Sequence, residues 1–156
     1  MLKEVLLTNL KTAISDVLET MFFQPVQIDD SHHDLKEWLS EDPHHLGARL
    51  GFSGPITGTC YVLVPDQGGA EMAANFLGIE EEALQREQVV DTVKEALNMI
   101  GGRMLALCDE SGAFHLDIPE IADTDAVSAD LLGDAEGSIL FLETADNRLL
   151  AGLTIT

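Results

Sequence analysis

Three polar side chains are spaced so that they fall together on one side of a helix. Glu95 follows Asp91 by four residues, and Asn98 follows Glu95 by three. At about 100° per residue, these steps return to the same helical face. A carboxylate can pair with a cation, and a neutral amide can both donate and accept hydrogen bonds. This polar stripe is therefore either a site for a partner's polar and charged groups or ordinary solvated surface.

The segment that must position these groups is an amphipathic helix predicted from Gln88 to Leu107. Apolar residues recur in it at steps of three and four, the spacing of a buried helical face. The apolar positions are Val90, Val93, Leu97, Ile100 and Met104. The polar stripe, which Gly102 continues, lies roughly 160° away from them. We expect the apolar face in the core and the polar stripe at the surface.

The composition predicts a single domain over residues 1–156 with an aliphatic core. Hydrophobic residues make up 46% of the chain and aromatic residues 5%, as in a globular protein that packs through aliphatic side chains. The chain has 8 Lys and Arg against 28 Asp and Glu, which gives a formal net charge of −20. Such a chain repels phosphate backbones and anionic lipids, so nucleic acid and membranes are not expected as partners.

Several features favour the cytoplasm. The N-terminal segment lacks the apolar run and cleavage site of a signal peptide, and no stretch approaches the roughly 20 apolar residues that span a bilayer. Cys60 and Cys108 adjoin apolar residues and have no metal-binding spacing. We therefore expect them to be reduced core thiols. The five histidines lie mainly as adjacent pairs in polar loops, a pattern that does not predict a metal site.

Helices precede strands along the chain, and the strands come in pairs. Periods of three to four residues mark helices, alternation marks strands, and Gly or Pro marks their ends. The predicted helices are 2–23, 70–77 and 88–107, the strands are 24–28, 45–52, 58–64, 114–118, 137–143 and 148–155, and the loops are 29–42, 65–69, 79–87, 109–112 and 119–134. Within 29–42, a marginal helix around Trp38 is the alternative to a loop.

This order predicts an α+β fold with an internal pseudo-repeat. We expect a two-layer structure, in which an antiparallel sheet of paired hairpins packs against two long amphipathic helices. The first helix repeats the offsets of the polar stripe with Ser15, Glu19 and Phe22. Phe22 takes the place of the carboxamide, and its aromatic ring has no amide group to donate or accept hydrogen bonds. We therefore expect the first copy to be silent.

The run D-x3-E-x2-N, followed about twenty residues later by Pro119, resembles the signature of the CheC, CheX and FliY family of chemotaxis phosphatases. The letters LETMF at 18–22 and ALNMIGG at 96–102 are similar to the opening helix and the motif helix of that family. One intact motif beside one degenerate copy resembles the CheX type more than the CheC type. The spacing to Pro119 is slightly shorter than is usual in the family.

The resemblance implies a phosphatase that hydrolyses the aspartyl phosphate of a CheY-type response regulator. In that role Asn98 orients the attacking water, and Glu95 pairs with the lysine of the regulator's active site. The residues implied to support the site or contact the partner are Asp91, Gly101, Gly102 and Pro119. The regulator supplies its own Mg²⁺, so the resemblance implies no cofactor and no metal bound by this chain.

These residue types suit that reaction. An acyl phosphate is already reactive, so the remaining task is to hold a water in line with the phosphorus. A neutral amide does this without adding negative charge beside the phosphate. Gly101 and Gly102 each cost about 1 kcal/mol of helix propensity relative to Ala, which is tolerable where another backbone approaches closely.

Other interpretations of the same residues stay open. The helix face could serve a non-catalytic adaptor that holds a phosphorylated regulator or another signalling protein. Asp91 could be an acid favoured by the helix dipole near the N-terminus. The run from Asp123 to Val127 imitates the DxDxV nucleophile motif of haloacid-dehalogenase-type phosphatases. We set that motif aside because no apolar strand leads into it.

The sequence also predicts a homodimer. The chain ends in a predicted strand, 148–155, and an unpaired edge strand invites pairing with a second copy. The resemblance implies the same state, because CheX-type relatives dimerise through their sheets.

Overall fold

The structure is a computed structural model that describes residues 2–29, 31, 33–40, 44–108, 112–133 and 138–156. The helices are α1 (Leu2–Phe22), α2 (Leu35–Leu39), α3 (Asp66–Leu77), α4 (Arg86–Cys108) and α5 (Thr124–Gly133), with a short 3₁₀ helix, η1 (Glu81–Ala83). The strands are β1 (Gln27–Asp29), β2 (His45–Ser53), β3 (Gly58–Pro65), β4 (His115–Leu116), β5 (Glu120–Ala122), β6 (Ser138–Glu143) and β7 (Arg148–Ile155). The predicted turn at 109–112 lies outside the described residues except for Gly112.

The strands form an antiparallel sheet in the order β1-β6-β7-β3-β2, and both β4 and β5 pair with β2. The two predicted hairpins, β2–β3 and β6–β7, are confirmed. They meet where β3 pairs with β7, with Cys60 opposite Leu153. The last strand is therefore interior, and the prediction that it forms an unpaired edge is wrong. One of its neighbours is its own hairpin partner β6, and the other, β3, comes from a distant part of the sequence.

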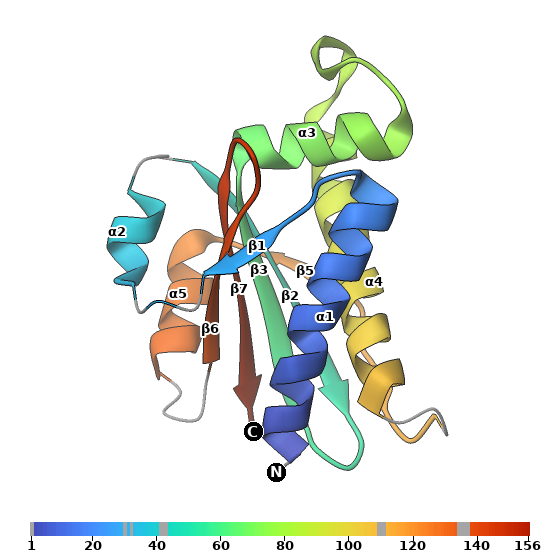
Figure 1. The fold of residues 1–156 in the computed structure, drawn as a ribbon, viewed down its shortest axis with the longest axis vertical. Coiled ribbons are helices and arrows are strands. Elements are labelled where there is room, and N and C mark those ends of the chain that lie inside the picture. Colours follow the sequence, from blue (N-terminus) through green and yellow to red (C-terminus); the bar gives the residue numbers. More distant parts are fainter. Residues whose placement is uncertain (1, 30, 32, 41–43, 109–111, 134–137) are drawn as a thin grey trace.

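The sheet carries helices on both faces. Figure 1 shows α1 and α4 side by side and antiparallel on one face, with α2 and α5 on the other. The smaller face has its own core, in which Trp38 of α2 and Val127 of α5 pack with Leu63 and Leu150 of the sheet. The α+β class and the antiparallel sheet are confirmed. The prediction of two layers is corrected to three, because the second face of the sheet is also apolar and needs cover.

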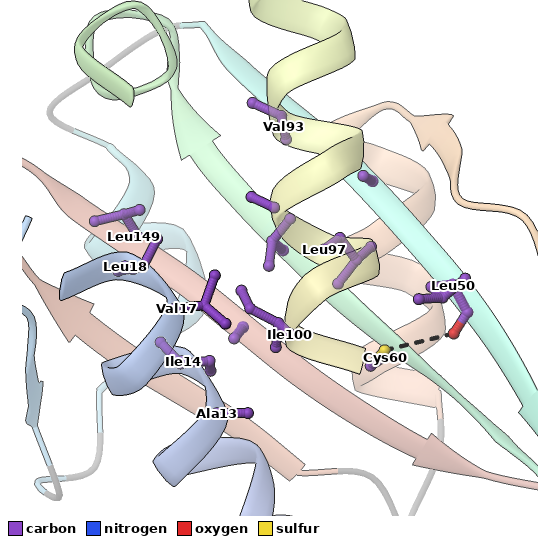
Figure 2. Close-up of a cluster of buried hydrophobic side chains, with 14 of the residues drawn as sticks. Ala13, Ile14, Val17, Leu18, Leu50, Cys60, Val93, Leu97, Ile100 and Leu149 are labelled. Atoms are coloured by element: carbon purple, nitrogen blue, oxygen red, sulfur yellow. Dashed lines mark hydrogen bonds between the residues drawn. The ribbon is translucent and has the colours of Figure 1, made fainter. Parts of the chain in front are cut away.

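The larger core lies between the sheet and the two long helices. Figure 2 shows Val93, Leu97 and Ile100 of α4 approaching the sheet beside the inner side of α1. Cys60 lies in the same layer, fully buried, and its thiol donates a hydrogen bond to the Leu50 carbonyl oxygen at 3.5 Å. Burial raises the pKa of this thiol to about 12, so it stays protonated. The apolar stripe of the motif helix is therefore core, as predicted.

The internal pseudo-repeat is visible in the order of the elements. A long helix, an edge strand, a short helix and a hairpin occur first as α1, β1, α2 and β2–β3, and again as α4, β5, α5 and β6–β7. Each edge strand pairs with the hairpin of the other half: β1 with β6, and β5 with β2. The two halves are therefore interlocked in one sheet.

Four segments predicted as loops contain helical residues. The segment 29–42 contains α2, which is the alternative of a marginal helix around Trp38, and 79–87 contains η1 and the first residues of α4.

In the segment predicted as loop at 65–69, Pro65 ends β3 and Asp66 begins α3. Within α3, Gly69 packs so closely that a Cβ atom would lie 3.1 Å from Val89 of α4. The segment 119–134 contains β5 and α5, and Asp123 caps α5 by accepting a hydrogen bond from the Ala126 N–H at 2.7 Å. The DxDxV run is thus a helix cap. The predictions of loop at 65–69 and 119–134 were wrong because small and acidic residues serve packing and capping here.

Among the described helices, none is both long enough and apolar enough to cross a membrane.

Candidate functional site

The candidate site lies on α4, which runs without interruption from Arg86 to Cys108. Its first turn is fixed by Gln88, whose side-chain oxygen accepts a hydrogen bond from the Gln85 N–H at 2.9 Å. This is the reciprocal half of a capping box, in which the third helical residue reaches back to the cap. The cap and the buried face set the rotation of the helix. Every polar side chain along it then has a defined direction.

The predicted polar stripe lies at the surface of α4. Asp91 and Glu95 are exposed, and Asn98 and Gly102 are half-buried. Because the helix begins two residues before Gln88, Asp91 falls in its second turn. The helix dipole acts mainly within the first turn. The dipole interpretation of Asp91 is therefore weakened.

The polar side chains of the stripe do not contribute hydrogen bonds or ion pairs to the described part of the fold. Within the described part of the chain, the side chains of Asp91, Glu95 and Asn98 make no hydrogen bond or ion pair. The nearby Thr92 differs, since its hydroxyl donates to the Gln88 carbonyl at 2.8 Å. A carboxylate and a carboxamide that the protein leaves without partners can bind groups of another molecule without breaking internal bonds.

The two glycines of the motif helix lie on different sides. Gly101 is buried, and a Cβ atom there would come 2.7 Å from Cδ2 of Leu50 on β2. A Cβ atom at Gly102 would meet only Leu116, at 3.8 Å. Gly101 therefore serves the close approach of α4 to the sheet. Of the two implied roles, support of the site is the one that fits this buried position, whereas Gly102 lies on the open side.

Pro119 lies near the same margin of α4. It is half-buried and stands between β4 and β5, both of which pair with β2 under α4. Leu116 of β4 lies against the positions of both glycines. The fold thus brings the segment that contains Pro119 to the side of the motif helix, although about twenty residues of sequence separate Pro119 from Asn98.

The first copy of the motif is different in structure as well as in sequence. Glu19 is exposed on α1, at the position equivalent to Glu95. Phe22 is fully buried and stacks on Phe76, with ring centroids 5.0 Å apart. The position equivalent to Asn98 therefore belongs to the core and shows no polar group to a partner.

No metal-binding cluster of three or more His, Cys, Asp or Glu side chains occurs in the ranges that the structure describes. His33 is held by Asp29 at 2.8 Å, and its ring packs beside Trp38. His32 lies outside these ranges.

A cavity of about 840 Å³ lies where the end of α1, the helix α3 and the β6–β7 turn meet, and no residue of α4 lines it. This cavity and the motif on α4 therefore lie in different parts of the molecule. We favour the motif, because its polar groups are exposed on a helix and groups of another molecule can reach them without a cavity.

Comparison with protein families identifies one match over most of the chain. A family model described as "Chemotaxis phosphatase CheX" matches residues 46–143, a range that includes α4 and Pro119. No curated protein is significantly similar in sequence.

Solved structures share the fold at low sequence identity. The chemotaxis protein CheX from Vibrio vulnificus has a TM-score of 0.73 and 18% identity, covering 97% of this chain and 96% of that one. A CheC-like protein from Shewanella oneidensis has a TM-score of 0.70 and 16% identity, covering 97% and 98%. In a CheX-CheY-BeF3-Mg²⁺ complex from Borrelia burgdorferi, the matching chain has a TM-score of 0.66 and 12% identity, covering 96% of each chain. At these identities the likeness supports the fold.

Proposed function

Because the chain belongs to the CheX family of chemotaxis phosphatases, we propose that it hydrolyses the aspartyl phosphate of a CheY-type response regulator. The observation that carries the proposal is the exposed stripe of α4, where Glu95 and Asn98 have no internal side-chain partner in the described residues. A relative with this fold was crystallised with CheY, BeF3 and Mg²⁺. A partner of that kind presents polar and charged groups, which Glu95 and Asn98 can bind.

Asn98 is assigned the orientation of the attacking water. Its amide oxygen accepts a hydrogen bond from water while its NH₂ group donates to a phosphoryl oxygen. Hydrolysis of an acyl phosphate needs little more than a water held in line with the phosphorus, and the regulator's Mg²⁺ neutralises the developing charge. The chain therefore needs no metal or cofactor of its own for this step.

Glu95 is assigned an ion pair with the lysine of the regulator's active site. Its carboxylate is exposed one helical turn before Asn98, so both side chains reach the same partner surface. A charge pair of this kind fixes the register of the two proteins more than it contributes to chemistry. Asp91, Gly102 and the segment with Pro119 are assigned to the surrounding contact surface.

We propose a homodimer in the cytoplasm as the working form. The edges available for pairing among the described strands are β1, which pairs with β6, and, at the other end of the sheet, β4 and β5, which both pair with β2. The unpaired cysteines fit a reducing compartment. A monomer mass by light scattering at micromolar concentration would contradict the dimer.

The decisive experiment follows the decay of regulator phosphate with Mg²⁺ present. A phosphatase accelerates this decay, whereas a non-catalytic adaptor binds through the same face and leaves the rate unchanged or slows it. We expect acceleration by the unmodified chain and its loss in Asn98→Ala. Binding alone does not separate the two functions, because both predict it.

A further inference from the structure

One basic side chain, Lys94, stands within the proposed docking face. It follows Asp91 by three residues and precedes Asn98 by four, and residues at these separations are surface neighbours with Cβ atoms about 5–6 Å apart. It also stands two helical turns before Gly101, so it lies over the margin of α4 that faces β2. Lys94 is half-buried, as expected where the aliphatic stem lies along the protein and the ammonium group reaches water.

The charge of Lys94 is not used within the described part of the chain. Its ammonium group has no ion pair or hydrogen bond there, whereas the other two cations of α4 are engaged. Arg86 pairs with Asp66 at 3.2 Å, and Arg103 pairs with Asp16 at 3.4 Å. Lys94 is thus available to an anion on another molecule.

The proposed partner presents such anions. An aspartyl phosphate that binds Mg²⁺ is bordered by phosphoryl oxygens and by the carboxylates that hold the ion. At long range, a chain of net charge −20 repels this surface. Asp91 and Glu95 add to the repulsion on the docking face itself. Lys94 is the cation on α4 that can offset it at short range.

We propose that Lys94 is the electrostatic docking residue of this face, and that its ammonium meets the anionic groups that border the regulator's acyl phosphate. The identity of the partner rests on the proposed phosphatase function. Lys94 has a positioning role in this account, and orientation of the water remains with Asn98.

The dependence on salt follows from this role. An exposed charge attracts most strongly at low ionic strength, because the screening length falls from about 10 Å at 0.1 M salt to about 3 Å at 1 M. Removal of the Lys94 charge should therefore weaken association at low salt, and the difference from the unmodified chain should vanish as salt is added. A structural role in packing the lysine stem would not show this dependence.

The test compares Lys94→Met, which removes the charge and keeps a long stem, with Lys94→Arg, which keeps the charge. The matched control is Lys36→Met. Lys36 is exposed on α2, on the opposite face of the sheet, and its side chain likewise has no ion pair among the described residues. Each protein is measured for affinity to CheY-type regulators of the source cell that carry Mg²⁺ and beryllofluoride in place of the phosphoryl group. Each is then assayed for decay of regulator phosphate.

We expect Lys94→Met to lose about two- to fivefold in affinity and in kcat/KM at low salt, with kcat unchanged. This difference should disappear near 1 M salt, and Lys94→Arg and Lys36→Met should match the unmodified chain. An equal loss in Lys36→Met would assign the effect to net charge and overturn the proposal. A Lys94→Met protein that equals the unmodified chain at low salt, or that loses kcat alone, would overturn it too.

The experiment also separates this inference from the proposed function. If the unmodified chain binds the regulator without accelerating decay, the phosphatase function fails, and the affinity series still decides the role of Lys94. If the unmodified chain binds none of the regulators, both proposals are wrong.

Discussion

Glu95 and Asn98 stand on the same face of α4 in different environments. The carboxylate of Glu95 is exposed, whereas Asn98 is half-buried, one turn before the glycine that packs against the sheet. A partly covered amide has less rotamer freedom to lose when it is fixed against a partner. An exposed carboxylate acts mainly through its charge, which salt screens. We expect Asn98 to govern turnover and Glu95 to govern affinity.

Glu95→Gln should lower the affinity for the phosphorylated regulator by about three- to tenfold, with a smaller effect on turnover at saturation, because an interface charge pair is lost. Apparent KM and kcat for regulator phosphate measure this split. Glu19→Gln is the matched control, since Glu19 is exposed at the equivalent position of α1. Equal losses in the two variants, or a loss confined to kcat, would contradict the assignment.

At the scale of single residues, helical spacing was enough to predict which side chains of the stripe reach the surface. The spacing of Asp91 and Glu95 predicted their exposure correctly. It did not separate Gly101 from Gly102, because a step of one residue turns about 100° and the result depends on where β2 lies. That position is set by strand pairing far along the chain.

At the scale of elements, the glycine pair gives a test of how α4 sits on the sheet. Gly102→Ala should raise the free energy of unfolding by up to about 1 kcal/mol, because Ala favours the helix and the added Cβ atom meets only Leu116 at 3.8 Å. Gly101→Ala should not gain this stability, because its Cβ atom would lie 2.7 Å from Leu50 in the core. Urea unfolding of the two variants measures the difference. A larger gain for Gly101→Ala would contradict this packing.

The long helices and both hairpins were predictable because their periodicity extends over many residues. The short elements were not, since their signals are local and easily assigned to loops. In α3, Gly68 and Gly69 look like a loop in sequence, but both lie within the helix, and Gly69 allows close packing against Val89 of α4. In α5, the acidic Asp123 looks like loop or motif but is a helix cap, with Val127 and Leu131 as the buried side. A search for capping residues before such apolar pairs is the signal that could have found α5.

At the scale of the whole molecule, the pseudo-repeat explains the strand order. The hairpins of the two halves lie side by side, so β3 and β7 pair at the centre of the sheet. On the outer sides of the hairpins, β1 pairs with β6 and β5 pairs with β2. These pairings join residues that are distant in sequence, and local patterns carry no information on them. For this reason β7 was predicted at an edge of the sheet, and the second layer of helices was not predicted.

The degenerate copy of the motif in α1 cannot be restored to a working site by one substitution. Phe22→Asn would recreate the motif in α1, but Phe22 is fully buried against Phe76. We expect a loss of about 3–5 kcal/mol in unfolding free energy and no gain in phosphatase rate. Met21→Asn, at the exposed neighbouring position, is the control and should cost little. An unfolding midpoint of Phe22→Asn equal to that of the unmodified chain would contradict the buried placement.

In the proposed function, Asn98 of α4 positions the attacking water, and one rate constant depends on this role. This is the rate constant for loss of acyl phosphate from a CheY-type regulator saturated with the chain, in the presence of Mg²⁺. We expect the unmodified chain to accelerate this loss and Asn98→Ala to slow it by about 100-fold, while affinity for the beryllofluoride-loaded regulator is retained. An unchanged rate constant in Asn98→Ala, or no acceleration by the unmodified chain that binds the regulator, would contradict the account.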